Sequence, residues 1–170
     1  MRKLIYLFCL SLALALPAKG MPEQISERDM KTALIYNFAV FTTWPLIAGE
    51  TFNICVFEED RENINNHLLS TKKISGKQTS LLVIRNINAI NNCQVLYLEA
   101  KKIRNKRLAD TLQNNSILTI VNSTENTTNT GIINILLINN RFNFTINNET
   151  ARDSNLTLSS KLLRLAAEVY

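Results

Sequence analysis

The chain has 170 residues, 46% of them hydrophobic, and it carries a formal net charge of +5. This length suits one domain with a core of its own. The sequence holds one histidine, four glycines and no Cys-x-x-Cys pair. With so few of these residues we expect no metal site, no cofactor, no glycine-rich phosphate loop and no nucleophile activated by histidine.

The N-terminal segment has the pattern of a secretory signal peptide. Arg2 and Lys3 precede an apolar run over residues 4–16, and the small residue Gly20 follows a few positions later. A retained membrane anchor is the alternative, but the run is shorter than the roughly 20 residues that a spanning helix needs. We therefore predict a signal peptide at residues 1–20, removed on export to the periplasm, and a single domain over residues 21–170.

Most of the positive charge belongs to this segment. Its removal takes away three cations and no acids, so the net charge falls from +5 to +2. A short basic run remains at residues 101–107, where we favour the solvated start of a helix. The alternative is a surface that meets an acidic partner. We expect no nucleic-acid partner.

The first element after the signal is an amphipathic helix at residues 29–41, because apolar residues recur there every three or four positions and stop at Trp44 and Pro45. Asn37 lies on the apolar face. It is either a buried amide with specific hydrogen bonds, which we favour, or part of the rim of a pocket.

The rest of the chain alternates short apolar runs with helical patterns. Late in the chain comes a hairpin at residues 132–138 and 141–146. Its strands are joined by Asn139 and Asn140, which tolerate the backbone of a two-residue turn. The pattern predicts a three-layer α/β sandwich with a mainly parallel central sheet, an antiparallel edge hairpin and a C-terminal helix. The remaining predicted strands lie at 52–57, 79–84, 95–98 and 117–121, and the remaining helices at 60–69, 105–113, 148–153 and 160–169.

Two cysteines, Cys55 and Cys93, remain in the exported domain. Export makes a disulfide between them plausible. Two buried, reduced thiols are the alternative, because the sequence does not place their α-carbons within bridging range.

No group of residues calls for catalysis. Ser159, Ser160 and Lys161 suggest a serine–lysine pair, but adjacent helical positions face different ways. A helix cap at Ser159 or Ser160 and an exposed lysine explain them better. We predict that the protein is not an enzyme.

Three segments resemble the YfiR family of periplasmic regulators. They are MKTALIYNFAVFTTWP from Met30 to Pro45, the cysteine-bearing runs NICVF and CQVLYL, and the closing run GIINILLINNRFNFTIN with SSKLLRLAAEV. The resemblance implies an α/β protein that represses an inner-membrane diguanylate cyclase of the YfiN kind. Binding of the cyclase's periplasmic domain would lower cyclic di-GMP and biofilm formation, and the only membrane contact would run through that partner.

Carried over to this chain, the resemblance also implies dimers and a Cys55–Cys93 disulfide. Some family members have a second cysteine pair, which this chain lacks. The residues that it marks for binding a partner or ligand are Tyr36, Asn37, Phe41, Trp44, Pro45, Ser159, Ser160 and Lys161.

Two questions stay open at this point. The Trp44–Pro45 corner is equally well explained as an anchor for a partner and as a structural plug that ends the helix. The alternative function is a periplasmic small-molecule-binding or sensor accessory protein that acts on another membrane sensor.

Overall fold

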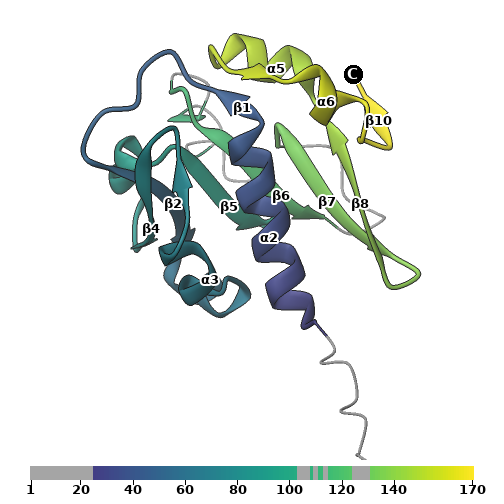
Figure 1. Ribbon diagram of the computed structural model, residues 1–170, viewed down its shortest axis with the longest axis horizontal. Coiled ribbons are helices and arrows are strands. Elements are labelled where there is room, and N and C mark those ends of the chain that lie inside the picture. The colour runs from purple at the N-terminus through teal and green to yellow at the C-terminus, as the bar shows by residue number, and fades with distance from the viewer. Residues whose placement is uncertain (1–24, 103–107, 109–110, 113–114, 124–130) are drawn as a thin grey trace, which may run out of the picture.

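The computed structural model describes residues 25–102, 108, 111–112, 115–123 and 131–170 (Figure 1). The predicted signal peptide lies outside the described residues. So does most of the predicted helix 105–113, whose described positions, Leu108, Thr111 and Leu112, are helical. No helix in the described part of the chain is long and apolar enough to cross a membrane.

A mainly parallel sheet forms the centre of the described structure. Its strand order is β10-β8-β7-β6-β5-β2-β4-β3, and neighbours from β4 to β7 run parallel. These inner strands are nearly continuous apolar runs, because both of their faces are covered. They are β2 (Thr51–Phe57), β4 (Lys77–Ile84), β5 (Val95–Glu99), β6 (Leu118–Ser123) and β7 (Ile133–Ile138).

The two faces of the sheet support two cores. On β2, Ile54 and Val56 point into the first core, and Cys55 and Phe57 point into the second. The helix α2 (Glu27–Val40) lies across the first face (Figure 1), together with α3 (Asn66–Ser70), α5 (Asn148–Asp153) and α6 (Ser160–Leu163). The 3-10 helix η2 (Ile87–Asn92) and Leu108 lie on the second face. The predicted three-layer α/β sandwich is confirmed.

Cys55 and Cys93 form a disulfide in the second core, with their α-carbons 5.7 Å apart. Both cysteines are buried. The bond ties the middle of β2 to the end of η2, two residues before β5 begins.

The hairpin was correctly predicted, with Asn139 and Asn140 at φ 49° and 60° between β7 and β8 (Arg141–Ile146). The sheet continues past it, however, because β10 (Glu168–Val169) pairs with the outer side of β8. The hairpin is therefore one strand in from the edge.

Two helix predictions were wrong in part. The predicted helix 160–169 ends at Leu163, because Ala167 and Tyr170 donate their backbone N–H groups to Phe144 and Ile146 of β8. The predicted helix 60–69 is the 3-10 helix η1 (Glu58–Asn63), two extended residues and α3. The break arises because Ile64 is buried in the first core and Asn65 caps α3.

Besides β10, three other short strands were not predicted. One is β3 (Lys73–Ile74), which pairs antiparallel with β4. The other two, β1 (Thr42–Thr43) and β9 (Thr157–Leu158), pair with each other in a separate antiparallel sheet. That small sheet joins the end of α2 to the C-terminal segment.

Candidate functional site

The pairing of β1 with β9 brings distant parts of the chain together. Thr42 lies opposite Leu158, and the N–H of Ser159 donates to the carbonyl of Phe41 at 2.9 Å. The helix α2 ends there, since the Thr42 hydroxyl donates to the Phe38 carbonyl at 2.7 Å. We call this place the corner and define it by six of the predicted residues, namely Phe41, Trp44, Pro45, Ser159, Ser160 and Lys161.

On the α6 side of the corner, Ser159 caps the helix as predicted. Its Oγ accepts the N–H of Leu162 at 3.2 Å. The Lys161 ammonium lies 5.3 Å from the centre of the Phe41 ring, a cation–π distance. Ser160 and Lys161 are exposed. This side therefore presents a hydroxyl and a positive charge beside an aromatic ring.

Trp44 is the most buried aromatic side chain of the corner, with 8% of its surface exposed. Its ring meets Phe52 edge-on at 5.0 Å between centroids, and it packs into the first core. This packing is the structural role that the sequence left open. The indole Nε1, however, is buried without a hydrogen-bond partner. An unpaired buried donor costs about 1–3 kcal/mol of stability. Packing into the core therefore accounts for the position of the ring but not for its unpaired N–H group.

A cavity of about 400 Å³ opens beside Trp44. Arg152 and Asn155, both exposed, supply its polar wall, and Pro45 lies on its apolar side. The volume is in the range of small-ligand pockets and also fits a large side chain of a protein partner. Its other lining residues are Thr43, Leu156 and Thr157.

Tyr36 and Asn37 do not belong to the corner. They line a second cavity, of about 240 Å³, between α2 and α3. The Tyr36 hydroxyl donates to the Lys73 carbonyl at 3.3 Å, and the Lys72 ammonium lies 6.0 Å from the Tyr36 ring centre. Asn37 is exposed, so the favoured prediction of a buried amide was wrong. The amide lies at the rim, because α2 turns this position toward the groove beside α3 and away from the sheet.

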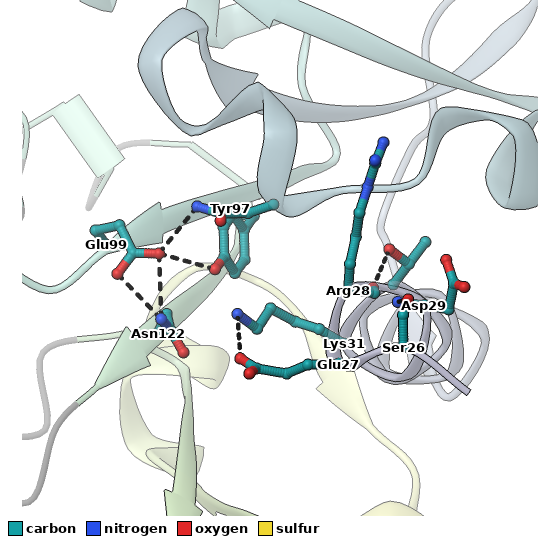
Figure 2. Close-up of polar contacts among 10 residues, drawn as sticks. Ser26, Glu27, Arg28, Asp29, Lys31, Tyr97, Glu99 and Asn122 are labelled. Atoms are coloured by element: carbon teal, nitrogen blue, oxygen red, sulfur yellow. Dashed lines mark hydrogen bonds and ion pairs between the residues drawn. The ribbon is translucent and has the colours of Figure 1, made fainter. Parts of the chain in front are cut away.

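Sequence reasoning missed a polar network at the carboxyl ends of β5 and β6. Figure 2 shows Glu99 facing Tyr97 and Asn122. The Glu99 carboxylate accepts hydrogen bonds from the Tyr97 hydroxyl at 3.0 Å and the Asn63 amide at 3.2 Å, and Asn122 donates to both oxygens at 3.1 and 3.0 Å. Burial, and next the negative charge of Glu99, raises the pKa of Tyr97. The phenol thus remains a hydrogen-bond donor.

A buried ion pair lies near this network. The Lys102 ammonium is 2.8 Å from Asp60 and 2.6 Å from Glu59, and it lies 4.6 Å from the centre of the Phe57 ring. The Lys102–Asp60 contact lacks the angles of a directed hydrogen bond, so its attraction is mainly charge. The sequence does contain a signal for this ion pair. Glu59 and Asp60 follow the predicted strand β2 and Lys102 follows β5, and ligands of parallel sheets usually bind at the carboxyl ends of the strands.

The described residues contain no group of three or more His, Cys, Asp or Glu side chains that could hold a metal ion. At the corner, the Ser159 hydroxyl serves as a helix cap. The geometry there suits contact with another molecule, through an aromatic surface, exposed cations and a cavity.

Comparison with known proteins identifies the family of this chain. The model of a protein family described as YfiR/HmsC-like matches residues 28–167, which is most of the chain and all of both surfaces described above. No curated protein matches.

Proposed function

Since the chain belongs to the YfiR/HmsC-like family, we propose that it is a periplasmic binding protein that represses an inner-membrane diguanylate cyclase. Repression would follow from binding to the periplasmic domain of the cyclase. The family match supports this reading, and so does the signal-peptide pattern of residues 1–20, which indicates export. Release of the repressor would raise cyclic di-GMP and promote biofilm.

We place the contact with the cyclase at the corner. The observation that carries this step is the β1–β9 pairing, which assembles six residues from the two ends of the domain on one surface. Leu46, next to Pro45, is 80% exposed, and Lys161 and Arg152 add positive charge. An exposed apolar side chain, with cations elsewhere at the same end of the domain, suits a partner surface that is partly apolar and partly acidic.

Cellular cyclic di-GMP tests the proposal. Deletion of the gene should raise cyclic di-GMP and biofilm, and expression of the wild-type protein should reverse both. Two variants, Lys161→Glu in the corner and Leu46→Arg beside it, should fail to reverse them because they change exposed side chains of the proposed contact. Arg141→Glu reverses an exposed charge at the far hairpin and should complement fully. Deletion without any rise in cyclic di-GMP would overturn the proposal.

The alternative is a periplasmic small-molecule-binding protein that acts on another membrane sensor. The cavity of about 400 Å³ beside the unpaired Nε1 of Trp44 favours it. A ligand that accepts this N–H should raise the melting temperature of the wild type. The Trp44→Phe variant keeps an aromatic ring without the donor, so it should lose most of that rise.

A further inference from the structure

The order of the strands creates a crevice in the described sheet, away from the corner. From β2 the chain moves outward to β4, whereas β5 and β6 follow on the other side of β2. The connection after β2 covers the first face, where Ile64 and Leu69 are buried. The residues after β5 cover the second face, where Leu108 is buried. The carboxyl ends of β2 and β5 therefore separate two oppositely directed connections, which is where open α/β sheets bind ligands.

A cavity of about 560 Å³ occupies this place. Apart from Leu108, its lining residues lie at the ends of β2, β4 and β5 or within four residues after them. Its apolar side consists of Phe57, Ile87 and Leu108, and its polar side consists of Glu59, Arg85, Asn86, Asn88, Lys101 and Lys102. None of these residues belongs to the corner or to the groove between α2 and α3.

The polar wall carries three cations and one carboxylate. Lys102 is held by Glu59 and Asp60, as described above. Lys101 is exposed and takes part in none of the ion pairs found among the described residues. Lys101 therefore adds to the cavity wall an exposed cation that forms no ion pair with a described carboxylate, although its charge, after the hydrogen bond from Lys102, helps to lower the pKa of Glu59.

Arg85 offers the second cationic group. Its Nε and Nη2 each donate to a carboxylate oxygen of Glu58 at 2.9 Å, in the two-pronged geometry that guanidinium groups use for carboxylates and phosphates. Both side chains are largely exposed, at 78% for Arg85 and 54% for Glu58. Exposed pairs of this kind contribute little to stability, so a ligand anion can exchange with Glu58 at small cost.

We infer that this crevice binds a small organic anion with an aromatic or apolar part. The anionic group would contact the Lys101 ammonium and the Arg85 guanidinium, in competition with Glu58. The apolar part would lie against Phe57, Ile87 and Leu108. This inference does not depend on the identity of the membrane partner, because the crevice shares no residue with the corner.

Fluorescence titration with anilinonaphthalene sulfonate tests the inference. This probe joins an aromatic part to a sulfonate and brightens in an apolar site. The disulfide-bonded wild type should give a saturable rise. Lys101→Glu and Arg85→Gln should each weaken binding at least tenfold, because each removes a charge-assisted contact from an exposed position.

The matched control is Arg141→Glu, which makes the same charge reversal as Lys101→Glu at the distant end of β8. Its affinity for the probe should stay within twofold of the wild type. Melting temperatures of all variants are measured in parallel, since the probe also binds partly unfolded protein. The inference is overturned if the folded wild type shows no saturable rise, or if Arg141→Glu weakens binding as much as Lys101→Glu does.

Discussion

Ser159 donates its backbone N–H to the carbonyl of Phe41 at 2.9 Å, and this bond joins the end of the first helix to the start of the last one. Beside it, the two-residue strands β1 and β9 pair antiparallel. The corner thus depends on contacts between residues far apart in the sequence.

Removal of the disulfide should lower the free energy of unfolding by about 4 kcal/mol in the loop-entropy model, since the bond spans 38 residues. We propose to compare Cys55→Ala/Cys93→Ala with the wild type by urea unfolding. Addition of a reductant should lower the stability of the wild type and leave the double variant unchanged. A double variant as stable as the oxidised wild type would show that the bond contributes nothing.

Trp44→Ala should lower the free energy of unfolding by about 3–5 kcal/mol, because it empties a buried site against Phe52. Trp44→Phe should cost much less, since it retains a ring and removes the unpaired Nε1 donor. Urea unfolding of both variants measures the difference. Equal stability of Trp44→Ala and the wild type would mean that the ring serves only as an anchor for a partner.

Tyr97→Phe should lower the free energy of unfolding by about 1.5–3 kcal/mol at neutral pH, because the lost hydroxyl donates to the charged Glu99. The raised pKa of Tyr97 also predicts a pH dependence. The folded protein keeps the phenol protonated where the unfolded chain ionises, so this stability is present below the ordinary pKa of 10.0 and is lost as the pH rises above it.

Urea unfolding at a series of pH values around 10.0, the ordinary pKa of tyrosine, separates the loss of the hydrogen bond from the ionisation of the phenol. The stability of Tyr97→Phe should fall less steeply with pH than that of the wild type. Some slope should remain in the variant, because burial also raises the pKa of Tyr170. Identical slopes for the two proteins would argue against a buried, protonated Tyr97.

Lys102→Met should lower the free energy of unfolding by about 3 kcal/mol, since it leaves the Asp60 carboxylate buried without its cation. The double variant Lys102→Met/Asp60→Asn should recover most of that loss. A double-mutant cycle from urea unfolding gives the coupling between the two side chains. A coupling near zero would show that water, rather than Lys102, screens Asp60.

The sequence predicted those elements whose cause is local. Two adjacent asparagines are enough for the turn between β7 and β8, and the periodicity of apolar residues is enough for α2. Residues 160–169 also have a helical pattern, but pairing of β10 with β8 overrides it after Leu163. Such tertiary pairing leaves no mark in the periodicity of the segment itself.

The sequence identified candidate site residues but did not indicate which of them lie close together. The family resemblance marked Phe41 and Lys161, while only the β1–β9 pairing places the Lys161 ammonium over the Phe41 ring. The resemblance did not indicate that Tyr36 lies apart from Phe41 and Lys161. About one turn of α2 separates Tyr36 from Phe41, and this is enough to direct Tyr36 toward α3. The crevice residues Arg85 and Lys101 resemble ordinary surface cations until the strand order is known.

Co-purification from membranes is the sharpest test of the proposed contact with a cyclase. The tagged mature protein is incubated with detergent-solubilised inner membranes, and bound proteins are identified by mass spectrometry. We expect the wild type and Arg141→Glu to recover a diguanylate cyclase with a periplasmic domain, and Lys161→Glu and Leu46→Arg to lose it. Recovery of no cyclase, or equal recovery by all four proteins, would contradict it.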